Sequence, residues 1–183
     1  MATTTGPTVA DLLARNKATL SSFQPRPLFS EMPAMDLPLP STIIVGCCDA
    51  RAHPEEFFCL RPNEVIVLRT AAGRVSPVLK DLAALEAFIG YGKVKQLLIV
   101  HHTDCGGSHM KAADIKAHII SRRPAMKPEI EAWDTPSFGG KSPTESVKHD
   151  VAIVQQDELL SETLRKGTKG FVFDIKTGVV HEV

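Results

Sequence analysis

The pattern of apolar and polar positions separates short apolar runs from longer stretches with helical spacing. Four runs are rich in β-branched and apolar residues, as buried strands are. They cover residues 42–45, 65–68, 96–101 and 170–175. Stretches that suit helices lie at 77–88 behind a Ser76 cap, after Ser108, and at 145–166. Strands that alternate with helices predict an α/β fold, in which helices flank a central, mainly parallel sheet.

The order of the strands follows from one assumption about neighbours. If the runs at 42–45 and 96–101 lie side by side, with 65–68 outside the first, the order is 2-1-3-4. A tight turn at 176–178 and a final strand at 179–183 then add an antiparallel edge strand. The chain reverses direction between its first and third strands, and open α/β sheets bind ligands at such a point.

The N-terminal region has a different pattern. Residues 8–23 predict a helix that Thr8 and Asp11 can cap, and prolines recur from Pro25 to Pro40, so that stretch is a connector. Residues 121–143, which are rich in proline and glycine, predict a long irregular excursion. We therefore expect one domain over 1–183, with a helical arm and connector at 1–40 and an α/β core at 41–183.

Composition excludes several classes of function. The chain has 183 residues, of which 43% are hydrophobic, enough for one domain with a core. Lys plus Arg and Asp plus Glu are equal at 21 each, so the net charge does not favour binding to nucleic acid or to a membrane surface. No apolar stretch approaches the roughly 18 residues of a membrane span, and no secretory signal is visible. With only four cysteines, the chain is expected in the reducing cytoplasm.

Potential metal ligands follow two of the predicted strands. Cys47 comes after the run at 42–45, and His102 and Cys105 come after the run at 96–101. Two thiolates and one imidazole make three zinc ligands and leave a fourth position open, which favours catalysis over a structural role. A single cysteine after a strand is more often a small buried apolar residue, and we expect Cys48 and Cys59 to be buried thiols.

The residues around these ligands form two dense motifs. They are Cys47-Cys48-Asp49-Ala50-Arg51 and His102-Thr103-Asp104-Cys105-Gly106-Gly107. These two motifs resemble the C-x-D-S-R and H-x-x-C signatures of the β-class carbonic anhydrases, and the similarity includes the residues at 69–73 and 173–178. The sequence departs from that pattern at Ala50, where serine is usual, and at 69–73. The run 101–105 is similar to a compact subgroup that includes carbonyl sulfide hydrolases.

The resemblance implies a site and an activity. Cys47, His102 and Cys105 would bind one Zn²⁺ per chain, and Asp49 and Arg51 would form a catalytic dyad beside it. Further positions would line substrate or product, namely Gly106, Gly107, Ala71 and Gly73. The implied reaction is hydration of CO₂ to bicarbonate by zinc-hydroxide attack, or, as the alternative, hydrolysis of carbonyl sulfide (or CS₂) to CO₂ and H₂S. The family also implies a homodimer or tetramer, in which the arm reaches across a partner.

Other interpretations stay open at this level. Cys47 and Cys48 could serve a thiol redox protein, although no C-x-x-C motif is present, and a zinc module closed by Asp49 would lack activity. Asp49 and Arg51 could form an ordinary surface ion pair. The pair Gly106-Gly107 could be a plain turn, and Ser108 could cap the helix that follows it. His101 and His53 could shuttle protons or be structural.

Overall fold

The structure is a computed structural model that describes residues 6–183. Contacts within the chain group it into a unit that ends at Pro38 and a second unit, Leu39–Val183. The boundary falls within the proline-containing stretch that was predicted to be a connector. The second unit contains the whole sheet and every residue of the candidate site.

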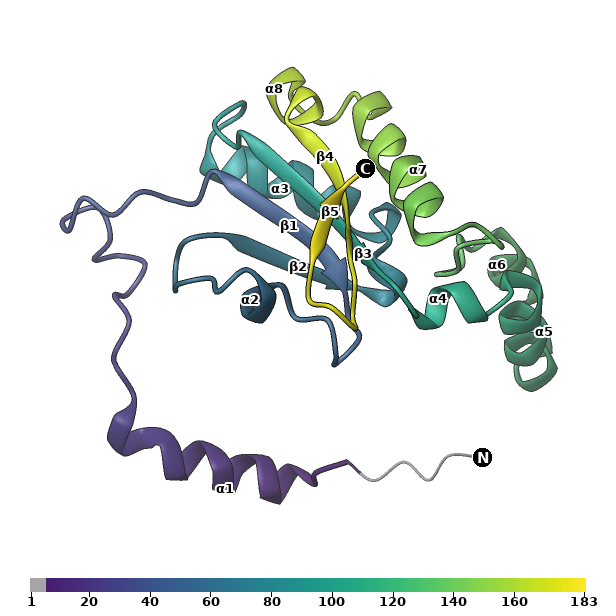
Figure 1. The fold of residues 1–183 in the computed structure, drawn as a ribbon, viewed down its shortest axis with the longest axis horizontal. Helices are drawn as coiled ribbons and strands as arrows, with labels where there is room; N and C mark the ends of the chain where they lie inside the picture. The colour runs from purple at the N-terminus through teal and green to yellow at the C-terminus, as the bar shows by residue number, and fades with distance from the viewer. Residues whose placement is uncertain (1–5) are drawn as a thin grey trace. The chain divides into compact units, whose positions relative to one another are not determined.

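The sheet has five strands in the order β2-β1-β3-β4-β5 (Figure 1). The strands are β1 Thr42–Cys47, β2 Ile66–Thr70, β3 Gln96–His102, β4 Thr168–Phe173 and β5 Val180–Glu182. The first four pair in parallel and β5 runs antiparallel to β4. The predicted α/β class and strand order, with an antiparallel edge strand, are confirmed.

Helices and 3₁₀ turns connect these strands. The helices are α2 Pro54–Phe57, α3 Leu79–Ile89, α4 Gly106–His109, α5 Ala112–Arg122, α6 Lys127–Ala132, α7 Pro143–Gln156 and α8 Glu162–Lys166. The 3₁₀ turns are η2 Ala71–Gly73, η3 Ser76–Val78 and η4 Pro124–Met126. Across residues 6–183, no helix combines the length and the apolar character that crossing a membrane requires.

The sheet buries apolar side chains on both of its faces. Ile43 and Val45 belong to a cluster that includes residues of α3 and α7, whereas Ile44 packs in a second cluster with Val100 and Phe173. Successive strand residues point to opposite faces, so a continuous apolar run suits a strand that is covered on both sides. This burial fixes the strand positions, and with them the places where β1 and β3 end.

Three helical predictions need correction. Ser76 begins the turn η3, and α3 starts at Leu79 without a side-chain cap. The helix predicted at 145–166 is two helices, because the buried Ser161 caps α8 while its hydroxyl donates to Glu86 Oε1 at 2.6 Å. The excursion at 121–143 is only partly irregular, since it contains η4 and α6. In each case a start or a break was invisible in the apolar spacing.

In the described part of the first unit, from residue 6 on, the chain forms the helix α1 Val9–Thr19, which continues into a 3₁₀ turn at Leu20–Ser22. The Thr8 hydroxyl accepts from the Asp11 amide at 3.2 Å, and the Asp11 carboxylate accepts from the Thr8 amide at 2.8 Å. This capping box confirms the predicted helix start. No residue of α1 is buried. Its apolar side chains are therefore open to contact with another surface.

Candidate metal centre

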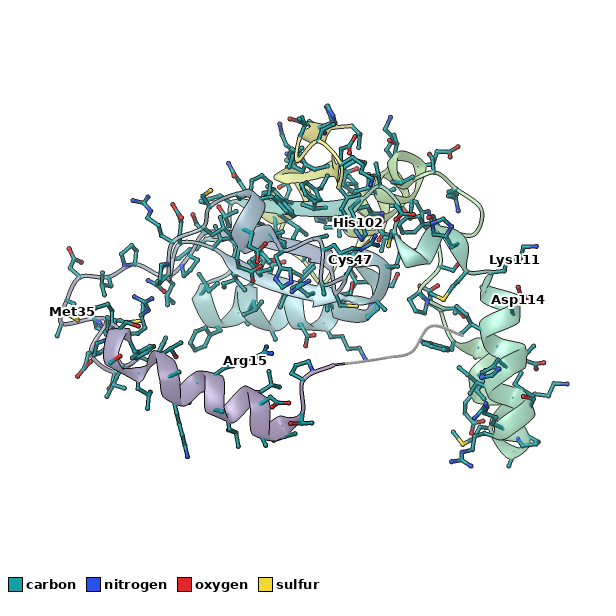
Figure 2. The ribbon with its side chains drawn as sticks, turned by 60° about the horizontal axis from the view of Figure 1, so that its bottom comes forward. Arg15, Met35, Cys47, His102, Lys111 and Asp114 are labelled. Atoms are coloured by element: carbon teal, nitrogen blue, oxygen red, sulfur yellow. The ribbon has the colours of Figure 1, made fainter. Side chains whose placement is uncertain are left out.

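The structure brings the three predicted ligands together at the carboxyl edge of the sheet. Cys47 is the last residue of β1, His102 is the last residue of β3, and Cys105 immediately precedes α4. One ligand atom from each residue lies within 4.8 Å of the other two. The three residues are 5%, 1% and 1% exposed, and Figure 2 shows the labelled Cys47 and His102 close together. The parallel pairing of β1 with β3 creates this cluster.

The geometry of the donor atoms fits zinc. The two Sγ atoms lie 3.7 Å apart, close to the edge of roughly 3.8 Å that a tetrahedron with Zn–S bonds of about 2.3 Å would have. His102 Nδ1 lies 2.9 Å from the Thr103 carbonyl oxygen, so Nδ1 carries the hydrogen and Nε2 keeps a free lone pair that can bind a metal. Nε2 is buried without a hydrogen-bond partner. A buried polar atom left in this way suits a metal ligand.

The two thiols also favour a cation. The hydrogen bond with Cys105 lowers the pKa of Cys47 to about 4, and the same bond raises the pKa of Cys105. The pair therefore shares one proton, since a second thiolate 3.7 Å from the first would be repelled by its negative charge. A bound divalent cation would remove that obstacle, because metal ligation requires both sulfurs as thiolates.

Asp49 and Arg51 form a two-point ion pair beside the cluster. Arg51 Nη2 donates to Asp49 Oδ2 at 2.7 Å and Arg51 Nε donates to Asp49 Oδ1 at 3.0 Å. These hydrogen bonds lower the pKa of Asp49 to about 2, so the carboxylate is ionised at neutral pH. Asp49 Oδ2 lies 3.8 Å from His102 Nε2, near the ligand atoms but turned to the arginine. The pair thus holds an anionic acceptor next to the cluster.

Comparison with known proteins assigns the family. The sequence model of the family described as carbonic anhydrase matches residues 42–180. The chain belongs to the β-carbonic anhydrase family. It is 29% identical to β-carbonic anhydrase 1 of Mycobacterium tuberculosis (strain ATCC 25618 / H37Rv) over 151 residues, covering 80% of this chain and 86% of the relative. The match extends beyond the two motifs to nearly the whole α/β unit, so this chain is an enzyme of the carbonic anhydrase type.

Two further relatives show the range of this β-carbonic anhydrase fold. A carbonic anhydrase structure from Streptococcus mutans superposes with a TM-score of 0.75 at 25% identity, covering 98% of this chain and 99% of that chain. The carbon disulfide hydrolase of Acidianus sp. (strain A1-3) is 24% identical over 155 residues, covering 73% of this chain and 72% of the relative. Similar sequences therefore include enzymes that are named for different substrates.

Two further residues, Arg69 and Asp104, hold the loop of the site in place. Arg69, at the carboxyl end of β2, donates to the Asp49 carbonyl at 2.7 Å and to the Cys47 carbonyl at 3.0 Å. Asp104 Oδ2 accepts from Arg51 Nη1 at 3.0 Å. The position of Arg69 at a strand end of a β-carbonic anhydrase sheet was a signal for it. Asp104 lies inside the H-x-x-C motif, and that place favours it as a tether of the ligand loop.

The four predicted substrate-side positions divide into two kinds. Ala71 and Gly106 are exposed, whereas Gly73 and Gly107 are buried packing positions. A Cβ on Gly107 would lie 2.5 Å from the Ala72 Cβ, and one on Gly73 would lie 3.3 Å from the Cys47 amide nitrogen. Gly73 also has φ +70°, which a side chain would strain. Both glycines thus permit the close packing of η2 and α4 around the cluster.

Other predicted roles change once the fold is known. Ser108 lies inside α4 and its hydroxyl donates to the Cys105 carbonyl at 2.7 Å, so it does not cap the next helix. Cys48 and Cys59 are exposed, contrary to prediction. Cys48 directly follows a buried strand residue and Cys59 lies in a turn with φ +50°, so both positions turn away from the core.

The two histidines considered for proton transfer have other partners. His101 is fully buried, its Nε2 lies 3.2 Å from the Gly73 carbonyl oxygen, and its ring stacks on Phe138 at 5.0 Å. Arg69 Nη1 lies 3.1 Å from His53 Nδ1, which therefore accepts this hydrogen bond. Both arrangements agree with the structural interpretation of these histidines.

A buried ion pair behind the cluster was invisible in the sequence. Arg74 Nε donates to Asp150 Oδ1 at 2.9 Å, and Arg74 Nη1 donates to the Ser137 carbonyl at 2.8 Å. Burial alone would raise the pKa of Asp150, but the hydrogen bond from His101 and the charge of Arg74 hold it below its ordinary value. These bonds join α7, the loop after α6 and the end of η2, and Asp150 also lies 3.4 Å from Nε2 of His101, the neighbour of the ligand His102.

Proposed function

We propose that this protein is a zinc enzyme that hydrates CO₂ to bicarbonate. The observation that carries the proposal is the buried cluster of Cys47, His102 and Cys105 next to an ionised carboxylate. Three protein ligands leave one coordination position for water or substrate. Bound zinc, one ion per chain, would supply the Lewis acidity that makes water nucleophilic near neutral pH.

The protein would contribute orientation through Asp49 and Arg51. Ionised Asp49 can only accept hydrogen bonds, so it would accept one from the attacking water and aim a lone pair of that water at the substrate carbon. Arg51 keeps Asp49 in this role, because both carboxylate oxygens are bonded to the guanidinium, at 2.7 and 3.0 Å. Their engagement favours the accepting role over one in which Asp49 closes the site as a fourth ligand.

A second candidate function is hydrolysis of carbonyl sulfide or carbon disulfide. The likeness to the carbon disulfide hydrolase of Acidianus sp. favours it. The chemistry is the same attack of water on the carbon of a small linear molecule, and the same residues would perform it. We infer CO₂ as the first candidate because the family description and the mycobacterial relative both name carbonic anhydrase.

One comparison of activities separates these candidates. We expect a single zinc-loaded preparation to accelerate CO₂ hydration in stopped-flow measurements, and removal of zinc by a chelator to abolish the effect. Sulfide release from carbonyl sulfide or carbon disulfide, with negligible CO₂ hydration, would instead establish the second candidate. Stoichiometric zinc without either activity from about pH 6 to 9 would indicate a non-catalytic zinc module. The thiol redox alternative requires accessible thiols, yet Cys47 is only 5% exposed.

We also propose that the chain forms a homodimer or a larger assembly through the helix α1. Its apolar side chains are half or more exposed. They are Val9 at 74%, Leu12 at 50% and Leu13 at 58%, and just beyond the helix Leu20 and Phe23 are each 59% exposed. Apolar side chains gathered in this way on one short helix mark a surface that packs against another.

Removal of the arm tests this assembly. A chain without residues 1–24 should elute from gel filtration at a smaller assembly size than the full chain, because the exposed apolar side chains of α1 would be lost. Light scattering on both chains gives the masses. An assembly of unchanged size would refute the role of the arm, and an unchanged zinc content would show that the α/β unit had stayed folded.

A further inference from the structure

The hydrogen bonds around the metal cluster continue outward to an exposed histidine. Arg51, which binds Asp49, also donates to Asp104 Oδ2 at 3.0 Å. The other oxygen of that carboxylate, Oδ1, lies 2.9 Å from His109 Nε2. The side chains of Arg51, Asp104 and His109 are 52%, 58% and 66% exposed. This chain of contacts leads from the dyad to the solvent.

The contact with Asp104 determines which ring nitrogen of neutral His109 carries the hydrogen. A carboxylate accepts and does not donate, so Nε2 carries the hydrogen and Nδ1 is left as a proton acceptor. Asp104 itself sits in a tight turn with φ +56°, and its carbonyl oxygen accepts from Arg51 Nη2 at 3.1 Å. The carboxylate is thus held on both sides, and it orients the imidazole.

His109 differs from the other histidines of the chain. His102 belongs to the ligand cluster, His101 is buried, and His53 uses Nδ1 to accept from Arg69. Within residues 6–183, three more histidines lie in other elements without a hydrogen bond to the dyad. They are His118 in α5, His149 in α7 and His181 in β5. Only His109 combines exposure with a bonded connection to Arg51.

The proposed reaction needs such a residue. Hydration of CO₂ by water yields bicarbonate and one proton, and that proton must reach the solvent in every turnover. We propose that His109 is the proton-transfer residue of this enzyme, with Asp104 as the residue that positions it. The inference rests on the proposed function and deepens it.

The proton balance is simple. Once the oxygen of water has bonded to the carbon of CO₂, the proton given up by water passes through solvent to Nδ1 of His109. The imidazolium then passes it to a buffer base, which returns the ring to its starting form. Arg51 does not carry the proton, because a guanidinium is not deprotonated in proteins. Histidine suits the task since its ordinary proton exchange falls near neutral pH.

Buffer molecules can reach this position. His109 lines an open groove of about 380 Å³ together with Met110 and residues of α5. The charged and titratable groups of that groove are Lys111, Asp114 and His118, and Figure 2 shows Lys111 and Asp114 at the start of α5. The groove is wide enough for a small base such as imidazole to approach His109.

The substitution His109→Gln tests the proposal, because glutamine can still donate to Asp104 but cannot take up a proton. In the zinc-loaded full chain at low buffer concentration, kcat for CO₂ hydration should fall about tenfold. The ratio kcat/KM should change less than about twofold, since proton release follows the attack on CO₂. Added imidazole should restore kcat of the variant. His118→Gln, on the same groove but outside the network, is the matched control and should behave as the wild type.

Each other outcome counts against the proposal. An unchanged kcat at low buffer would overturn it. A fall in kcat and kcat/KM together, without rescue by imidazole, would show that His109 only supports the structure. A wild type that does not hydrate CO₂ would overturn the proposed function and this inference with it. Activity in the wild type with no effect of the substitution would overturn the inference alone.

Discussion

Replacing Cys105 with serine should remove most of the bound zinc. The Cys105 sulfur lies 3.7 Å from that of Cys47 and is almost fully buried, so a hydroxyl in its place would be a neutral, weak ligand in a site built for a thiolate. We expect zinc affinity to fall by at least two orders of magnitude. This loss exceeds the loss of affinity that follows when a residue hydrogen-bonded to a ligand is changed. Metal analysis after dialysis against a chelator of known affinity measures the change.

Two neighbouring cysteines provide matched controls for this substitution. Cys48 and Cys59 are exposed and lie outside the ligand cluster. Cys48→Ser and Cys59→Ser should therefore keep one zinc per chain. If Cys105→Ser retained zinc at the wild-type level while remaining folded, the ligand set proposed above would be wrong. Loss of zinc in Cys48→Ser would point instead to a site centred on the Cys47–Cys48 pair.

Asp49→Ala should keep the zinc and lose most of the turnover. Asp49 is not among the three clustered ligand atoms, and Arg51 holds both of its oxygens away from them. The variant would lose the carboxylate that accepts a hydrogen bond from the attacking water, and we expect kcat/KM to fall on the order of 10²- to 10³-fold. Metal analysis and stopped-flow hydration of CO₂ on the same preparation separate binding from catalysis.

The control for Asp49 is an acidic residue with a similar partner elsewhere. Glu64 pairs with Arg61 at 3.0 Å on the surface, away from the cluster. Glu64→Ala should leave both zinc and turnover unchanged. Full activity in Asp49→Ala would exclude the dyad from the mechanism, whereas loss of zinc in that variant would show that Asp49 supports the metal directly.

The main elements of the fold could be predicted from local pattern. A strand covered on both sides must be apolar throughout, so the runs before Cys47 and His102 marked β1 and β3 without other information. Helix ends were harder, because the Ser161 hydroxyl that caps α8 also donates to Glu86, 75 positions away in the chain. Such a contact leaves no trace in the spacing of apolar residues.

The sequence by itself determined the strands and the chemical nature of the site: two thiols, one imidazole and an Asp-Arg pair placed where strands end. Tertiary structure decided which of these groups meet, since Cys47 and Cys105 are 58 positions apart and only the pairing of β1 with β3 brings their sulfurs to 3.7 Å. It also decided that Asp104 joins Arg51 to His109 and that Arg74 finds Asp150. Residue types fix what a side chain can bind, whereas distances between remote residues depend on strand order and register.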